Sequence, residues 1–276
     1  MNILIVGASS YLGSRLYIDL KNDFEVIGTF SSNRLFKDLI KLDITSKEEI
    51  LKIVKEINPE VIIHCANLPK NEAMVKDQKL AKKINLDSAS YLVEAANENG
   101  AKLIFISTIA SILDNDYYTS YKLSSEKEIK KTSAGWLVIR PAYILGLSPN
   151  TKNDRPFNRI YRNIKEKTSA VYDISWKTQC TYIGWISEII EKCIKNNIWN
   201  ETITISVKEE KSRFEIAKDI LKNFNIKVIP VDKKDATKTV SDDQSTLKKL
   251  ELPFYTYEEI INKIVNELKN HFQSGL

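Results

Sequence analysis

A tyrosine followed four residues later by a lysine could exchange a proton with a bound carbonyl group. On a helix, the two side chains lie on one face with their Cβ atoms about 5–6 Å apart. The ammonium group is expected to lower the pKa of the phenol from its usual value of about 10. Such pairs are formed by Tyr17 with Lys21, by Tyr118 with Lys122, and by Tyr161 with Lys165. The spacing alone does not distinguish them, so the surrounding elements must decide.

A second candidate site is the turn from Gly7 to Gly13, which reads Gly-Ala-Ser-Ser-Tyr-Leu-Gly. It lies between an apolar run and a helical pattern, and it holds two of the eight glycines of the chain. Small residues there let backbone N–H groups and a helix N-terminus approach a phosphate. An ordinary strand–helix turn is the alternative. The predicted cofactor contacts of this turn are Gly7, Ser9, Ser10, Tyr11, Leu12 and Gly13.

The end of the second apolar run bears on the choice of cofactor. In Rossmann folds, an acidic residue at this place binds the ribose 2′-hydroxyl of NAD, whereas an arginine accommodates the 2′-phosphate of NADP. This chain has no carboxylate there and carries Ser31, Ser32 and Arg34 instead. We therefore expect NADP(H) to be preferred and NAD(H) to be the second choice, with a solvated Arg34 as the alternative.

Short apolar runs alternate with helical periodicity over the first 140 residues. The expected strands are Asn2–Val6, Glu25–Thr29, Leu39–Leu42, Val61–Cys65, Leu103–Ser107 and Leu137–Ile139. The expected helices are Tyr11–Lys21, Lys47–Ile57, Ala73–Asn99 and Ser120–Lys131. Buried strands that alternate with helices predict parallel βαβ units, and right-handed crossovers then give helices on both faces of the sheet.

The pattern loosens after Arg140-Pro141, where shorter elements follow a loop bounded by Pro149 and Pro156. The chain is thus predicted to be an α/β protein with a Rossmann-type, doubly wound parallel sheet. We expect an NAD(P)-binding domain over residues 1–148 and a smaller C-terminal α/β substrate lobe over residues 149–276. Segments of the lobe are expected to interleave with the first domain.

This arrangement favours one of the three tyrosine–lysine pairs. Tyr118 and Lys122 follow the expected strand Leu103–Ser107, whose carboxyl end should border the cofactor crevice. Thr108 comes directly after that strand and offers a hydroxyl group that can hold a carbonyl oxygen. A coincidental pair on a helix surface is the alternative.

The sequence resembles the extended short-chain dehydrogenases/reductases, and within them the dTDP-4-dehydrorhamnose reductase branch that acts on nucleotide sugars. The resemblance rests on the order of several short motifs along the chain. They are Gly7–Gly13, Lys41–Thr45, Asn58–Ala66, Ile84-Asn85, Ile106–Thr108, Tyr118–Glu126, Arg140-Pro141, Gln179–Tyr182 and Ser212–Ala217. Four features depart from the family pattern. Ser10 stands at a glycine position, the segment between Thr108 and Tyr118 is short, Tyr121 precedes the lysine where a serine or threonine is common, and Gly184-Trp185 follows Tyr182 in place of the usual acidic residue.

The resemblance implies roles for individual residues. Thr108, Tyr118 and Lys122 would form the catalytic group, and Tyr118 and Lys122 would also contact the cofactor. Asp43 with Ile44 would lie near the adenine. Cys65, Ala66 and Asn67 would lie beside the cofactor, and Asn85 on the helix behind the active site. Gln179 and Thr181, together with Thr108, would hold the substrate. No metal site is expected.

The implied activity is that of an NAD(P)H-dependent oxidoreductase that reduces a nucleotide-linked keto-sugar, with reduction at the C4 ketone and Tyr118 as the proton donor. An epimerase or dehydratase of the same superfamily is a second hypothesis. The third, of a different class, is a non-catalytic dinucleotide-binding regulatory subunit, which the Ser10 substitution and the short segment before Tyr118 would fit.

Composition excludes several other classes. The net charge is +5, but the lysines are interleaved with acidic residues on helical patterns, which is not typical of a nucleic-acid-binding surface. The three cysteines are scattered and form no zinc-binding or disulfide pattern. No apolar run reaches the roughly 20 residues of a membrane helix. We expect a cytoplasmic protein that binds neither membranes nor nucleic acids. The sequence leaves the oligomeric state open, with a homodimer as one hypothesis.

Overall fold

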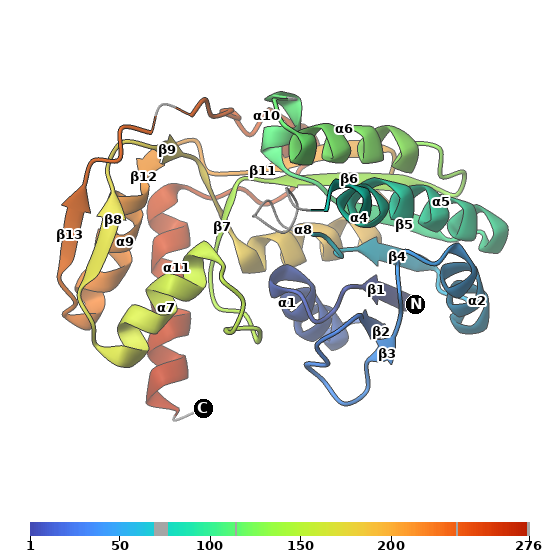
Figure 1. Cartoon of the computed structure of the whole chain (residues 1–276), viewed down its shortest axis with the longest axis horizontal. Coiled ribbons are helices and arrows are strands. Elements are labelled where there is room, and N and C mark those ends of the chain that lie inside the picture. Colours follow the sequence, from blue (N-terminus) through green and yellow to red (C-terminus); the bar gives the residue numbers. More distant parts are fainter. Residues whose placement is uncertain (69–76, 114, 236, 275–276) are drawn as a thin grey trace. The chain divides into compact units, whose positions relative to one another are not determined.

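The computed structural model describes residues 1–68, 77–113, 115–235 and 237–274 (Figure 1). The chain divides into two compact units. Unit 1 comprises Met1–Arg140 and Ile190–Ile203, and unit 2 comprises Pro141–Ile189 and Thr204–Leu276. The assignment of cofactor binding to one part and substrate binding to the other stays a prediction.

A seven-stranded sheet forms the centre of unit 1. Its strands are β1 (Asn2–Val6), β2 (Glu25–Phe30), β3 (Ile40–Lys41), β4 (Val61–His64), β5 (Lys102–Ile106), β6 (Trp136–Pro141) and β11 (Glu201–Ile205). They lie in the order β11-β6-β5-β4-β1-β2-β3, and the first six strands along the chain pair in parallel. The strand order reverses at β1, which has β2 on one side and β4 on the other. Ligands bind beyond the carboxyl ends of the strands at such a switch point.

Helices cover both faces of this sheet. They are α1 (Tyr11–Asp19), α2 (Lys47–Ile57), α4 (Gln78–Lys82), α5 (Ser88–Asn99) and α6 (Tyr117–Ile129). Leu4, Ile62 and Leu103 belong to one buried cluster with Ile50 of α2 and Leu92 of α5, so these helices pack on the same face. Side chains alternate along a strand, and the intervening residues, such as Ile3 and Ile63, are also fully buried. This two-sided burial explains why the strands are apolar throughout.

Local capping sets where two of these helices begin and end. The Ser46 hydroxyl accepts a hydrogen bond from the Glu49 N–H at the start of α2, and Asn58 ends it with a left-handed φ of 48°. At α6, Asp116 accepts from the Thr119 N–H while the Thr119 hydroxyl accepts from the Asp116 N–H. This capping box starts α6 at Tyr117, three residues before the predicted start at Ser120.

Unit 2 consists of short elements. Its strands are β7 (Tyr143–Leu145), β8 (Ala170–Asp173), β9 (Lys177–Thr178), β10 (Cys180–Tyr182), β12 (Lys211–Ser212) and β13 (Val228–Val231). Its helices are α7 (Pro156–Glu166), α9 (Arg213–Leu221), α10 (Ser245–Lys249) and α11 (Tyr257–Gln273), and α8 (Ile183–Lys195) runs from unit 2 into unit 1. The strands pair as β7 with β10, β8 with β13 and β9 with β12.

The predicted Rossmann-type parallel sheet is confirmed, but some elements differ from expectation. The sequence predicts one helix over Ala73–Asn99. Within the described residues this range forms three successive elements, which are α4, a π-helix over Lys83–Asp87, and α5. The first four residues of the expected helix lie outside the described ranges. The strand expected over Leu39–Leu42 has only two residues. No helix within the described residues is long and apolar enough to cross a membrane.

Candidate active site

The glycine turn lies at the switch point of the sheet. Gly7 follows β1 with a φ of +91°, which favours glycine, and its N–H donates to the Thr29 hydroxyl of β2 over 3.2 Å. A Cβ atom on Gly7 would lie 2.7 Å from the backbone nitrogen of Ala66, just beyond β4. The turns that follow β1 and β4 are therefore packed backbone to backbone, and only glycine fits at position 7.

Ser10 is the N-cap of α1. Its hydroxyl accepts a hydrogen bond from the Gly13 N–H over 3.0 Å. A Cβ atom on Gly13 would lie 2.2 Å from the Gly7 carbonyl oxygen and 2.8 Å from the Ser10 hydroxyl. The serine at this usual glycine position thus satisfies one of the helix N–H groups that would otherwise be open to an anion. Tyr11 and Leu12 are buried, and a contact of either residue with a phosphate stays a prediction.

The segment after β2 is exposed at Ser31, Ser32 and Arg34. The guanidinium of Arg34 donates to the Lys37 carbonyl and lies 5.6 Å from the centre of the Phe30 ring. The hydroxyl of Ser9 accepts from the Leu35 N–H over 3.3 Å, which links this loop to the glycine turn.

Asp43 and Ile44 follow β3. The Asp43 carboxylate accepts from the Thr45 N–H at 2.9 Å and from the Thr45 hydroxyl at 2.8 Å, so it forms a local turn at the surface. Ile44 is buried. The predicted position of both residues near an adenine stays a prediction.

The carboxyl end of β4 carries buried polar groups. Burial raises the pKa of the Cys65 thiol to about 12, although the charge of Lys122 opposes the shift, so the thiol stays protonated. The Oδ1 atom of Asn67 is buried and has no hydrogen-bond partner among the described residues. An unpaired buried acceptor is costly and is typical of a place where a ligand donates a hydrogen bond. The residue after Asn67, Leu68, is held by the buried side chain of Asn85. The Leu68 N–H donates to Asn85 Oδ1 at 2.8 Å, and Asn85 Nδ2 donates to the Leu68 carbonyl at 3.0 Å.

Tyr118 and Lys122 lie on α6, next to the end of β5. Lys122 is 4% exposed, and its ammonium donates to the carbonyl of Ile106, the last residue of β5, over 2.9 Å. The ammonium lies 4.6 Å from the centre of the Phe105 ring and 5.9 Å from that of the half-buried Tyr118. A buried positive charge is thus held beside the phenol.

A buried carboxylate, which the sequence reasoning did not single out for a role, organises the segment that carries Thr108. Glu126, one turn beyond Lys122, accepts from the hydroxyls of Ser107 and Ser111 at 2.5 and 2.9 Å. It also pairs with Arg140 of β6, at 3.0 Å from Nε and 2.5 Å from Nη2. Burial alone would raise the pKa of Glu126, but the hydrogen bonds from Arg140 and the serines outweigh it and lower the pKa.

The other two tyrosine–lysine pairs have different surroundings. Tyr17 donates to the Asp38 carboxylate, and Tyr161 of unit 2 contacts the ring of His271 at 3.1 Å. The pKa of Tyr17 is raised, first by burial and then by the hydrogen bond with Asp38, and burial raises the pKa of Tyr161. Both environments favour the protonated phenol and disfavour proton exchange near neutral pH.

The two predicted substrate residues of unit 2 are buried. The Gln179 amide donates to the carbonyls of Lys208 and Asp242, and its oxygen accepts from the Ser206 hydroxyl and the Asp242 N–H. The Thr181 hydroxyl donates to the Ile205 carbonyl and accepts from the Ala142 N–H at 2.8 Å. Both side chains hold backbone segments of unit 2, and direct substrate contact stays a prediction for them.

Unit 2 also gathers a group of aromatic and basic side chains that the sequence reasoning missed. The guanidinium carbon of Arg213 lies 4.3 Å from the centre of the Trp176 ring, and Tyr143 meets the same ring edge-on at 5.6 Å. Burial raises the pKa of Tyr143, while the positive charges of Arg213 and Arg159 act in the opposite direction. These residues come from distant segments, so spacing along the chain carries no signal of their proximity.

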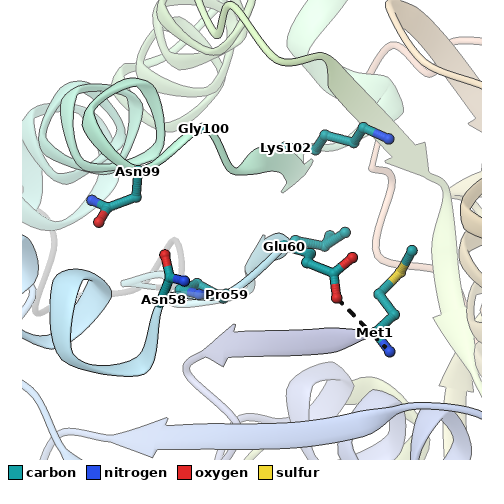
Figure 2. Close-up of a pocket in the computed structure, with 8 residues that line it drawn as sticks. Met1, Asn58, Pro59, Glu60, Asn99, Gly100 and Lys102 are labelled. Carbon is teal, nitrogen blue, oxygen red and sulfur yellow. Dashed lines mark ion pairs between the residues drawn. The ribbon is translucent and has the colours of Figure 1, made fainter.

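A pocket of 240 Å³ lies at the opposite, amino-terminal edge of the sheet (Figure 2). It is lined by Met1, Asn58, Pro59, Glu60, Val61, Asn99, Gly100 and Lys102. These residues precede β1, β4 and β5 or begin β4 and β5, whereas the glycine turn follows β1 and Lys122 contacts the last residue of β5. This pocket is therefore separate from the candidate active site.

The strand order and the glycine turn at its switch point define a Rossmann-type fold, with the Tyr118–Lys122 helix beside β5. Residues 1–114 match the family model of the RmlD substrate binding domain. Over this range, the match confirms the predicted resemblance to the dTDP-4-dehydrorhamnose reductase branch.

Individual relatives are distant. The chain is 22% identical to methionine adenosyltransferase 2 subunit beta of Danio rerio, over 81% of this chain and 74% of that protein. It is 27% identical to dTDP-4-dehydrorhamnose reductase of Aggregatibacter actinomycetemcomitans, over 53% of this chain and 43% of the enzyme. The structure of dTDP-4-dehydrorhamnose reductase from Bacillus anthracis, solved in complex with NADP, superposes with a TM-score of 0.80 at 23% identity and covers 96% of this chain and 99% of that one.

Proposed function

We propose that the protein is a nicotinamide-dinucleotide-dependent reductase of a nucleotide-linked keto-sugar, acting at the C4 ketone and preferring NADPH. One observation carries the proposal. The Gly7 turn, the Cys65–Asn67 segment and the ammonium of Lys122 all stand at the carboxyl ends of the adjacent parallel strands β1, β4 and β5.

The residues at this edge fit a dinucleotide. The Gly7 and Gly13 positions exclude a Cβ atom, so the backbone of the turn can lie against a pyrophosphate at the N-terminus of α1. The Oδ1 atom of Asn67, which has no hydrogen-bond partner within residues 1–68, 77–113, 115–235 and 237–274, would accept a hydrogen bond from the cofactor. When bound, the reduced nicotinamide would supply a hydride.

Proton transfer falls to the chain itself. Tyr118 would donate its phenol proton to the developing alkoxide, and the buried charge of Lys122 would stabilise the phenolate left behind. Thr108, held in place next to Ser107, would hydrogen-bond the same oxygen. The Arg213, Trp176 and Tyr143 group supports a nucleotide-linked substrate, because arginine and aromatic side chains bind phosphates and bases.

The variant Tyr118→Phe tests this assignment. It removes one hydroxyl and keeps the ring, so we expect turnover to fall by about 10²–10⁴-fold with nearly unchanged NADPH affinity. Turnover is measured as NADPH absorbance with a panel of nucleotide-linked 4-keto-sugars. Tyr161→Phe removes a phenol hydroxyl from unit 2, where it contacts His271, and should leave turnover unchanged. A Tyr118→Phe protein with wild-type turnover would contradict the mechanism.

The same assay distinguishes the alternatives. An epimerase or dehydratase would convert its substrate without net consumption of NADPH. A second candidate function, a dinucleotide-binding subunit of another enzyme, is favoured by the similarity to a methionine adenosyltransferase subunit over most of the chain. Tight NADPH binding with no turnover of any sugar in the panel would support that candidate.

A further inference from the structure

The loop over residues 31–39 carries the predicted recognition residues for the adenosine end of the dinucleotide, yet it has no helix or strand. Ser31, Ser32 and Arg34 are all exposed on it. A loop of this kind recognises a ligand well only if it is ordered beforehand, because ordering it upon binding costs conformational entropy. Side chains on α1 and directly after it contact the loop and hold it in one conformation.

The apolar part of the attachment is Tyr17 on α1, which is 3% exposed. Its ring stacks on Phe36 of the loop with a centroid distance of 4.9 Å. On its other side it packs over β2, where a Cβ atom on Gly28 would lie 3.0 Å from the Tyr17 ring. The ring is therefore enclosed between the sheet and the loop.

The polar part joins three groups. The Tyr17 hydroxyl donates to Asp38 Oδ2 at 2.5 Å, and the Lys21 ammonium donates to the Tyr17 oxygen at 2.6 Å and to Asp38 Oδ2 at 3.0 Å. Hydrogen bonds from Tyr17 and Lys21 lower the pKa of Asp38, so its carboxylate remains charged at neutral pH. We call Tyr17, Lys21 and Asp38 the loop clamp.

The loop clamp links the two regions that a dinucleotide would bridge. Tyr17 belongs to α1, which begins directly after its N-cap Ser10 in the glycine turn, and Lys21 lies in the short 3-10 helix Leu20–Asn22 that follows α1. The loop contacts the same turn through the Leu35 N–H and the Ser9 hydroxyl. Fixing Asp38 to α1 thus fixes the loop relative to the phosphate site.

We propose that the loop clamp pre-orders the 31–39 loop and thereby sets the affinity for the adenosine half of the cofactor, so that Tyr17, Lys21 and Asp38 are positioning residues. This inference rests on the proposed dinucleotide binding. Asp38 is an acidic residue shortly after β2, where such a residue could bind a ribose hydroxyl. Its carboxylate already accepts hydrogen bonds from Tyr17 and Lys21, so we assign it the positioning role instead.

The test separates the two halves of the cofactor by titrating purified full-length protein with 2′,5′-ADP and with reduced nicotinamide mononucleotide. In Tyr17→Phe and in Asp38→Asn, the Kd for 2′,5′-ADP should rise about threefold to tenfold, the range expected for the loss of one hydrogen bond. The Kd for the mononucleotide should not change. Since both variants act on the Tyr17–Asp38 hydrogen bond, the fold-loss of 2′,5′-ADP affinity in the double variant should be smaller than the product of the two single fold-losses.

Tyr161→Phe is the matched control, and its affinity for both ligands should equal that of the wild type. If the wild type binds 2′,5′-ADP and both clamp variants bind it equally well, the inference is wrong and the proposed function stands. Equal losses for the two ligands would also overturn it, because they would indicate a general structural effect. If the wild type binds neither half, both the inference and the proposed function fail.

Discussion

At the scale of single residues, the choice between the two dinucleotides depends on the charge at Arg34. Its guanidinium is exposed and donates to the Lys37 carbonyl of the same loop, which holds it at the end of β2. An arginine can bind a phosphate through two parallel hydrogen bonds, and no carboxylate among Ser31, Ser32 and Asn33 opposes it.

Arg34→Ala should therefore weaken NADPH binding by about tenfold or more, the amount expected for one or two charge-assisted hydrogen bonds. NADH, which lacks the 2′-phosphate, should bind nearly as before. Isothermal titration of wild type and variant with both dinucleotides measures the ratio of the two Kd values. Equal losses for NADPH and NADH, or a wild type that prefers NADH, would remove the basis for the predicted preference.

At the scale of elements, Glu126 joins α6 to the ends of β5 and β6. It is 2% exposed and pairs with Arg140, whose side chain is 18% exposed. The hydrogen bonds from Arg140 and from the two serine hydroxyls compensate for the burial of the Glu126 carboxylate, which therefore stays charged inside the protein. Breaking such a pair leaves an uncompensated buried charge on the partner.

We expect Glu126→Gln to lower the free energy of unfolding by about 3–5 kcal/mol, since Arg140 would lose its counter-charge. The matched control is Glu128→Gln on the same helix, which breaks a largely exposed pair with Lys131 and should cost about 1 kcal/mol or less. Urea unfolding of both variants measures the difference. Similar midpoints for the two variants would show that the buried pair contributes no more than the surface pair.

The same elements show what the sequence could and could not predict. The conformations of the glycine turn and of most strands of unit 1 are determined largely by residues adjacent in the sequence, so local sequence patterns predicted them. Glu126 and Arg140 were noted only as parts of motifs, because their pairing depends on how α6 packs against β6. The short strands of unit 2 and its Arg213–Trp176 contact join distant segments, and no local periodicity marks them.

At the scale of the whole molecule, His64 couples folding to pH. It is 1% exposed at the end of β4, and its Nε2 lies 3.3 Å from the Ser88 hydroxyl. Its ring is tilted by 39° against the Phe105 ring, with a centroid distance of 5.4 Å. Burial, aided by the charge of Lys122, lowers the pKa of His64 to about 3. The ring is therefore neutral in the folded protein throughout the neutral and mildly acidic range.

Because the unfolded chain binds a proton at His64 below about pH 6.5 and the folded chain does not, stability should fall as the pH falls below that value. The contribution of His64 between pH 7 and pH 5 should be about 2 kcal/mol. Urea unfolding at both pH values measures it. His64→Gln should have a correspondingly smaller pH dependence, whereas an unchanged dependence in His64→Gln would contradict the assignment.

The division of the chain has a consequence for biosynthesis. The last segment of unit 1, Ile190–Ile203, follows the whole first part of unit 2 (Pro141–Ile189) along the chain, and it supplies most of the edge strand β11 next to β6. A nascent chain that has emerged only as far as Arg140 therefore exposes β6 as an unpaired strand edge, which is prone to associate with other chains. The edge strand β11 can pair with β6 only after residue 203 has left the ribosome. Fragments that end near residue 148 should accordingly need chaperones or aggregate, although they contain the whole glycine turn and the Tyr118–Lys122 pair.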